Sequence, residues 1–314
     1  MTGLGAIAVG AALAVVLPML VPSLAILVTL ILAKGIVVLG IIVLLQAGQV
    51  SFGHAMFFAA GAYTAAFWGR HLGVGDLALY LLLGTATATL LGFVVGLFVL
   101  RYREIFFGML NLAFSMVLWS LLEKLFHLTN GADGIRVVRP TILGQSFSPE
   151  AFQYALLYAT LAVALVVLVF VQRYLASPLG QMLKAIKSNE TRLEYLGVSA
   201  KRVLLIGYVI SASLGGIGGV LVAVAQQIAT PEFAYWTKSG EFVFIAILGG
   251  SGHALGAFVG AAVFEIVRFY ASATLANAWQ LILGVVLIAI ILYVPNGLIG
   301  LGARRRAAGP AERT

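Results

Sequence analysis

Two charge-free apolar runs open this chain, Leu4–Ala33 and Gly35–Gly69, and each is longer than one membrane-spanning helix requires. About 20 apolar residues cross the hydrocarbon core of a bilayer, so these runs hold about three helices. Charged residues make up 10% of the 314 residues, against about 25% in an ordinary soluble domain. A water-soluble fold could not cover its surface with so few charges, so we predict an all-α polytopic membrane protein.

Breaks in the apolar runs predict a single transmembrane domain over 1–314 with about ten helices, some short or broken. Pro18, Pro22 and Ser23 mark the first break, and the polar run 46–51 marks the second. The piece at about 240–250 is too short for an ordinary span. We interpret it as broken or re-entrant, which membranes tolerate only where protein or water covers the backbone. The other expected helices are 4–20, 24–45, 53–69, 77–100, 105–126, 151–172, 203–228, 254–270 and 279–294.

Orientation follows from lysine and arginine, which gather in cytoplasmic loops. The polar segment 177–202, the pair Arg101 and Arg103, and the run 304–306 are therefore expected in the cytoplasm, with both termini. The loops 127–150 and 229–239 then face outward. The first 33 residues lack Lys and Arg, so the first apolar run is expected to be a retained helix and not a signal peptide. The same rule explains the net charge of +8 without nucleic acid.

The segment 177–202 has the pattern of two short helices. Ser177 followed by Pro178 is typical of a helix start, and Asn189 can cap a second helix that Gly197 ends. An apolar stripe follows the helical period and consists of Leu179, Met182, Leu183 and Ile186. Two interpretations remain open from these residues alone: an interfacial helix that only orients the chain, or a docking platform for a partner.

Catalytic and metal-binding motifs are missing. The chain has no GxxxxGK[ST] nucleotide loop, no HExxH, no cysteine and four scattered histidines. If ATP drives this protein, another chain must therefore bind it. Ser51 with His54, or Ser251 with His253, could suggest a hydrolase, but small polar residues also cap helices, and no acid lies near either pair in sequence. We predict that the chain is not an enzyme and binds no metal or cofactor.

Polar residues inside spans are costly and tend to be functional. Such residues are Gln46, Gln49, Asn111, Ser115, Gln226, Gln227 and Glu265. Glu265 and Arg268 are three residues apart on one helix and are expected to pair with each other. The trios 53–55 and 252–254 both read Gly-His-Ala and hint at an internal duplication, although chance is a serious rival in so glycine-rich a chain. Glycines at 92, 96 and 215–219 are expected to form close helix contacts.

Five stretches resemble the LivM-type permease subunits of branched-chain amino acid ABC importers. They are AGQVSFGHAMFFAAGAYTAAF at 47–67, REIFFGMLNLAF at 103–114, LTNGADGI at 128–135, SPLGQMLKAIKSNETRLEYLGV at 177–198 and YVPNGLIG at 293–300. They occur in the family's order and span nearly the whole chain. Glu104 and Asn130 stand where the family has glycine, Asn111 where it has threonine, and Tyr195 where a small residue is usual. The first three of these departures bear on the solute and not on the fold.

The resemblance implies a fold like the type II importers and transport by alternating access in a bacterial inner membrane. It implies a second homologous permease, two ATPase subunits that carry ATP and Mg²⁺, and a periplasmic solute-binding protein. The region that would contact the ATPase comprises Asn189, Glu190, Arg192, Glu194, Tyr195, Leu196 and Gly197. Candidate path residues are Gln46, Gln49, Ser51, His54, Asn111 and Ser115. Candidate contacts in the outer loop are Asn130, Gly131, Asp133 and Gly134.

The resemblance favours leucine, isoleucine, valine or a related amphipathic solute. A sugar, urea or aromatic-acid ABC permease of similar fold is the alternative within the transport class. An ion-coupled secondary transporter should carry several acids inside its spans, and only Glu265 is expected there. A membrane scaffold without transport is a third class, which the polar residues within spans disfavour.

Overall fold

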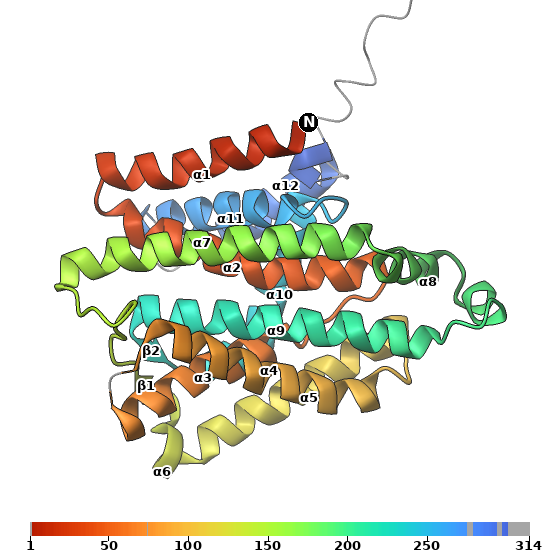
Figure 1. Ribbon diagram of the computed structural model, residues 1–314, viewed down its shortest axis with the longest axis horizontal. Coiled ribbons are helices and arrows are strands. Elements are labelled where there is room, and N and C mark those ends of the chain that lie inside the picture. The colour runs from red at the N-terminus through yellow and green to blue at the C-terminus, as the bar shows by residue number, and fades with distance from the viewer. Residues whose placement is uncertain (1, 74, 275–278, 294–296, 301–314) are drawn as a thin grey trace, which may run out of the picture.

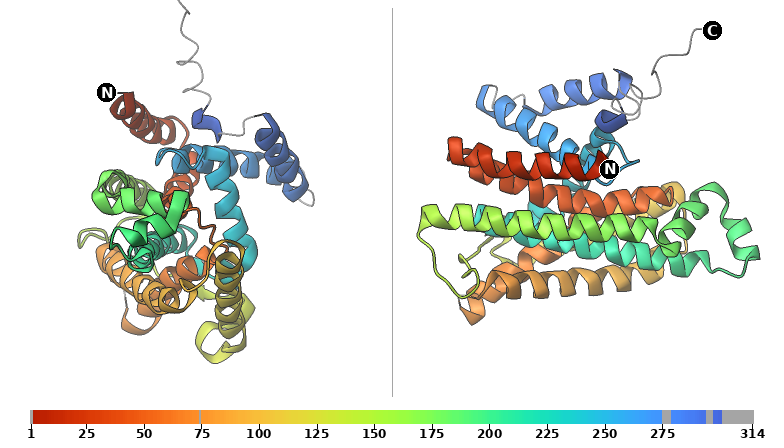
Figure 2. Two further views of the ribbon diagram at one scale, coloured as in Figure 1. Left: turned by 90° about the vertical axis from the view of Figure 1, so that its right-hand side faces the viewer. Right: turned by 45° about the horizontal axis from the view of Figure 1, so that its top comes forward.

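The computed structural model of the protein describes residues 2–73, 75–274, 279–293 and 297–300. The long helices form one bundle whose two ends carry different features (Figure 1). Helix α8 projects from one end, which we call the α8 end, and the short strands β1 and β2 lie at the other, which we call the loop end. The right-hand view in Figure 2 shows the same arrangement, and the left-hand view looks along the bundle from the α8 end.

Helices begin and end close to the positions expected from the apolar runs. In chain order they are α1 (Thr2–Leu20), α2 (Leu24–Gln46), α3 (His54–Leu72), α4 (Leu77–Val99), α5 (Glu104–Lys124), α6 (Phe126–Thr129), α7 (Pro149–Ala176), α8 (Pro178–Tyr195), α9 (Ala200–Gln226), α10 (Trp236–Gly249), α11 (Gly256–Thr274) and α12 (Trp279–Tyr293). The two-residue strands β1 (Ile135–Arg136) and β2 (Ile228–Ala229) pair antiparallel, and two 3₁₀ turns complete the chain, η1 (Gly131–Asp133) and η2 (Pro231–Ala234).

Six of the described helices are long and apolar enough to cross a membrane: α2, α4, α5, α7, α9 and α11. The expected short piece near 240–250 is α10, which begins earlier than expected, at Trp236, and has 14 residues. At 1.5 Å per residue it is about 21 Å long, less than the hydrocarbon core. The count of about ten spans is not established by helix length, and the run 304–306 used to orient the chain lies outside the described residues.

Helices α2 and α9 form the centre of the bundle. Each is apolar on nearly all sides, as expected of a helix surrounded by others. Glycines allow this close packing: a methyl group on Gly219 of α9 would overlap the carbonyl of Phe58 on α3, and one on Gly61 would overlap the backbone of Gly216. The predicted role of the α9 glycines as helix contacts is therefore confirmed.

The bundle has two halves with the same order of contacts. Helix α9 packs against α3 and α4 of the first half, and α2 packs against α10 and α11 of the second. Helix α3 thus corresponds to α10, and α4 to α11. The Gly-His-Ala trios do not follow this correspondence, because 53–55 begins α3 whereas 252–254 precedes α11.

The outer loop of the sequence prediction is more ordered than expected, because it contains α6, η1 and β1 and ends at Pro149. Asp76 ties it to α4: one carboxylate oxygen accepts the Ala78 N–H at 2.9 Å and the other accepts the Gly144 N–H at 2.8 Å. These backbone hydrogen bonds hold the pKa of Asp76 below its ordinary value of 3.8. The charged carboxylate therefore stabilises the loop end.

Candidate functional site

Helix α8 consists of two short helices, as the sequence predicted. The Ser177 hydroxyl accepts the Gly180 N–H at 3.3 Å, which caps the first helix. Asn189 leaves the helical conformation (φ −165°, ψ 97°), and its side-chain oxygen accepts the Arg192 N–H at 2.9 Å, which caps the second. Gly197 follows with φ +81°, the left-handed conformation that favours glycine.

The two helices of α8 differ in how they meet the bundle. Leu183 and Ile186 of the first helix are buried, whereas Leu179 is exposed, so the expected apolar stripe begins later than predicted. At the end of the second helix Tyr195 and Leu196 are 87% and 75% exposed. A depression of about 280 Å³ lies between the helices and is lined by Ala185, Ser188, Asn189, Arg192, Leu193 and Leu196.

One ion pair ties the second helix of α8 to the bundle. The Arg103 guanidinium, at the start of α5, donates to both carboxylate oxygens of Glu190, with a shortest distance of 2.7 Å. Leu193 adds a buried apolar contact. The segment is thus anchored at Glu190 and Leu193 and presents Glu194, Tyr195 and Leu196 to the outside, where all three are exposed.

The chain between α2 and α3 runs as non-helical backbone inside the bundle. Gln49 and Ser51 in this stretch are buried. The Gln49 side-chain oxygen accepts the Glu104 N–H at 3.0 Å, and Gln46 donates to the Ser251 carbonyl at 2.7 Å. Helix α3 then starts beside the first turn of α10, where the Ser239 hydroxyl accepts the Ala55 N–H at 2.9 Å. Irregular backbone at this depth is tolerated because protein covers it.

Three further candidate path residues are buried and hydrogen-bonded within the subunit. Asn111 donates to the Phe107 carbonyl at 2.8 Å and accepts from the Tyr208 hydroxyl, and Ser115 donates to the Ala234 carbonyl at 2.7 Å. His54 lies 2.6 Å from the Ser211 hydroxyl. These contacts hold α3, α5, α9 and η2 together, while a role in the path itself stays a prediction.

The partner of His54 bears on the hydrolase alternative. The Ser211 hydroxyl donates its one hydrogen to the Gly40 carbonyl at 2.6 Å, so the hydrogen between it and His54 belongs to the imidazole Nε2. His54 is therefore a donor to Ser211 and not a base for Ser51, which instead accepts the Gly53 N–H at 3.4 Å. The Ser51–His54 pair has no catalytic arrangement.

The outer-loop residues make a compact turn at the loop end. Asn130 has φ +59° and its side-chain oxygen lies 3.4 Å from Arg70 Nη1. Gly134 has φ +71°, and a Cβ there would lie 2.9 Å from Thr230. Asp133 is exposed between them. The structure thus brings the four loop candidates together, but at the opposite end of the bundle from α8.

Two of the residues that depart from the family pattern have a left-handed backbone conformation. Glu104 and Asn130, which stand in place of glycine, have φ +52° and +59°. Glycine adopts this left-handed region at no steric cost, and asparagine tolerates it better than most residues. Glu104 therefore carries local backbone strain at the start of α5.

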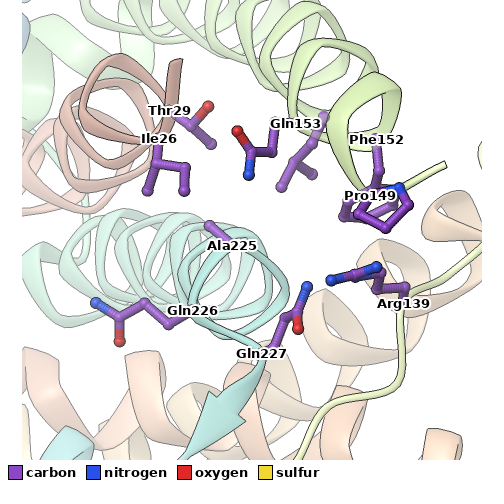
Figure 3. Close-up of a pocket in the computed structure, with 10 residues that line it drawn as sticks. Ile26, Thr29, Arg139, Pro149, Phe152, Gln153, Ala225, Gln226 and Gln227 are labelled. Carbon is purple, nitrogen blue, oxygen red and sulfur yellow. The ribbon is translucent and has the colours of Figure 1, made fainter. Parts of the chain in front are cut away.

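Gln226 and Gln227 lie at the end of α9 and not within the span as expected. Gln227 has φ +58°, and its amide oxygen, in the orientation that satisfies both groups, accepts from Arg139 Nε at 2.5 Å. Both glutamines line a pocket of about 300 Å³ between α2, α7 and α9 at the loop end. Figure 3 shows Arg139 and Gln227 facing each other across its edge, while Gln226 points away.

The expected Glu265–Arg268 pair is part of a larger cluster that the sequence reasoning missed. Lys34 of α2 contacts the carboxylates of both Glu241 on α10 and Glu265 on α11. Lys238 lies 3.1 Å from Glu241, and Arg268 lies 3.6 Å and 3.7 Å from the two carboxylates. Lys34, the lone lysine between two charge-free runs, is the sequence signal that could have indicated this cluster, because a charge inside a span needs a buried partner. Among the described residues there is no group of acids, histidines or cysteines arranged to hold a metal.

Comparison with known proteins places these features in a family. Residues 23–291 match the family model for the permease component of the branched-chain amino acid transport system. The chain is 29% identical over 274 residues to the high-affinity branched-chain amino acid transport system permease protein LivM of Escherichia coli, a match that covers 80% of this chain. That match covers 64% of the E. coli protein, so the chain spans less than two-thirds of its length.

Two further relatives are more distant. The probable branched-chain amino acid transport permease protein LivM of Methanocaldococcus jannaschii is 28% identical over 249 residues, 73% of this chain and 69% of that protein. The permease protein LivH of E. coli is 26% identical over 147 residues, 46% of this chain and 47% of that protein. No solved structure matches the chain.

The family match covers most of the chain, from the start of α2 to α12, and includes all six of the described helices that are long and apolar enough to span a membrane. The relatives that match over the longest stretches are transport permeases. The chain is therefore a multi-pass membrane protein that belongs to the permease-component family of the branched-chain amino acid transport systems.

Proposed function

We propose that this chain is one transmembrane subunit of an ATP-driven importer of a type II-like fold. A second homologous permease, two ATPase subunits with ATP and Mg²⁺, and a solute-binding protein would complete the transporter. The assembly would lie in a bacterial inner membrane, with the α8 end in the cytoplasm and the loop end in the periplasm. Alternating access between two packed arrangements would carry the solute.

The observation that carries this proposal is the second helix of α8. It is capped at Asn189, ended at Gly197 and anchored through Glu190, yet it leaves Tyr195 and Leu196 exposed at the tip of the projection. A helix that only oriented the chain would place its apolar side chains against the bundle or the bilayer. A rigid, exposed element of this kind suits docking against a soluble subunit, here the ATPase.

The solute proposed is leucine, isoleucine, valine or a related small amphipathic molecule. Support comes from the family and from relatives whose names specify branched-chain amino acids. A sugar, urea or aromatic-acid solute is the alternative. Uptake of each labelled solute by the reconstituted transporter, with its solute-binding protein, separates these classes.

The class of transporter is tested by purification and uptake. The tagged chain should copurify with a second permease and two ATPases, and vesicles containing the complex should take up labelled leucine only with ATP inside. Recovery of the chain alone, with uptake driven by an ion gradient, would contradict the proposal.

The docking role is tested by reversing a charge at the exposed tip. Glu194→Lys should abolish ATP-coupled uptake while the protein remains inserted and stable, and Gly197→Pro should do the same because proline cannot adopt φ +81°. Glu150→Lys makes the same charge change in the first turn of α7, at the loop end, and should leave uptake intact. Normal uptake by both α8 variants would refute the docking role.

A further inference from the structure

The second helix of α8 is less firmly held in the bundle than the first. The backbone leaves the helical conformation at Asn189, and this kink separates the two helices. The first helix is held by buried apolar side chains, whereas the second is attached by the buried Leu193 and by the ion pair between Glu190 and Arg103. Movement of the second helix therefore reaches the bundle through these attachments.

Arg103 joins the second helix of α8 to the turn between α4 and α5. Its Nε and Nη2 donate to the Glu190 carboxylate at 2.9 Å and 2.7 Å, a two-point geometry that orients both side chains. Its Nη1 donates to the carbonyls of Leu100 and Tyr102, at 2.6 Å and 3.0 Å. Because the guanidinium is planar and rigid, a displacement of Glu190 is passed to the turn.

The turn is connected to the stretch between α2 and α3, residues 47–53, which we call the α2–α3 link. The Glu104 N–H donates at 3.0 Å to the side-chain oxygen of Gln49, which is buried in the link. The first helix of α8 also lies against the link, since a Cβ at Gly48 would be 3.2 Å from Lys187 Cγ. Contacts from both sides of the α8 kink therefore meet at the α2–α3 link.

The α2–α3 link leads to the place where the two halves of the bundle meet. It continues into α3, whose Ala55 N–H donates to the Ser239 hydroxyl of α10 at 2.9 Å. Before the link, Gln46 at the end of α2 donates to the Ser251 carbonyl, between α10 and α11, at 2.7 Å. The link thus lies between the second helix of α8 and the contact of α3 with α10.

We infer that the second helix of α8 acts on the α2–α3 link through Arg103 and Gln49, which serve as positioning residues for transport. The inference rests on the proposed transport function and names the route by which the ATPase acts on the bundle. Displacement of the second helix moves the turn between α4 and α5, the turn moves the link, and the link changes the contact of α3 with α10. Non-helical backbone suits this role, because hinges are a few loop residues that absorb changes in φ and ψ.

A thiol on the α2–α3 link reports its movement, because the chain has no cysteine of its own. Phe52 is an exposed residue of the link. In the complete transporter, the rate at which N-ethylmaleimide labels Phe52→Cys should differ at least about fivefold between the nucleotide-free state and the state trapped with ATP and vanadate. Adding Arg103→Met should abolish this difference. Arg101→Met removes an exposed cation from the same turn and should leave the difference intact.

Transport measurements separate a positioning role from a merely structural one. Arg103→Met should lower the amount of solute imported per ATP hydrolysed by at least about fivefold, with the ATPase subunits still bound. Gln49→Met leaves the ion pair of Arg103 in place and should have the same effect on labelling and on transport. It takes the place of Arg103→Met if that variant does not assemble, and Val50→Cys likewise takes the place of Phe52→Cys.

Three results would overturn the inference. They are an equal labelling rate in the two states, a difference that survives Arg103→Met or Gln49→Met, and unchanged import per ATP in these variants. If such a complex still imports solute with ATP, the transport function stands and only the route is wrong. A complex without ATPase subunits would overturn the transport function and the inference with it.

Discussion

Helices α3 and α10 hold corresponding places in the two halves of the bundle, yet they are fixed by different forces. Each follows a long central helix and an irregular stretch, and their first turns meet through Ala55 and Ser239. Helix α3 packs against α9 through glycines and aromatic rings. Helix α10 is tied to α2 through Lys34 and Glu241, while Gly249 and Gly260 make equally close backbone contacts between α10 and α11.

This difference separates the contact between α3 and α9, which is rigid, from the contact between α10 and α2, which can be rearranged. Glycine contacts between backbones are short-ranged and have one good geometry. Ion pairs can exchange partners, and each carboxylate of the cluster has more than one cation within reach. We infer that in an alternating-access cycle α10 and α11 move relative to α2, while α3, α4 and α9 move together as a block.

The largest expected effect comes from removing Lys34 from the charge cluster of α2, α10 and α11. Lys34→Met should destabilise the protein by about 3–5 kcal/mol, because it removes the most buried cation and leaves two carboxylates with only the more exposed Lys238 and Arg268 as partners. Thermal unfolding in detergent, followed by size-exclusion chromatography, measures the loss. Lys34→Met combined with Glu265→Gln removes one charge of each sign and should recover much of the stability. A single variant as stable as the parent would show that α10 and α11 are not held by this cluster.

A smaller effect is expected where α3 meets α9. Gly219→Ala should cost about 1–3 kcal/mol, because the added methyl overlaps the Phe58 carbonyl. Gly240→Ala on α10 is the matched control: nothing lies within 4 Å of the added methyl, and alanine favours the helix by up to about 1 kcal/mol. The same thermal assay compares the two. Equal responses would mean that the contact between Gly219 and Phe58 does not hold α9 against α3.

Much of this architecture could be predicted from the chain. The apolar runs located the long helices, and the caps at Ser177, Asn189 and Gly197 described α8 correctly because capping is a local effect. The charge cluster could not be found in this way, since Lys34 and Glu241 are 207 residues apart. Periodicity also says nothing about which helices become neighbours, so the repeat was aligned on a short sequence match and not on α3 and α10.

The backbone strain at Glu104 gives a modest gain in stability. Glu104→Gly should stabilise the protein by about 1 kcal/mol, because glycine removes the steric cost of φ +52°. In the parent, the Glu104 carboxylate interacts favourably with the positive end of the α5 dipole. The glycine variant loses this interaction, which offsets part of the gain. Glu104→Ala, which keeps the strain and loses the charge, should be less stable than the parent. A glycine variant less stable than the parent would show that the charge outweighs the strain.

The smallest effect concerns the start of α4, where Asp76 ties the loop end to the first half. Because the folded pKa of Asp76 lies below its ordinary value of 3.8, its carboxylate stabilises the folded loop above that pH. The stabilisation is lost as the pH falls below 3.8 and through the folded pKa, where protonation weakens the bonds to the Ala78 and Gly144 N–H groups. Hydrogen exchange at these two amides, corrected for the intrinsic effect of pH, should therefore accelerate as the pH falls below 3.8. Asp76→Asn should show fast exchange at every pH, since its neutral amide never gains the charge. A parent protein whose corrected exchange rate does not change with pH would contradict the assignment.

The backbone amides at the start of α10 serve as the internal reference in the same sample. No carboxylate caps this helix, and its contact with Ala55 of α3 is made by the neutral Ser239 hydroxyl.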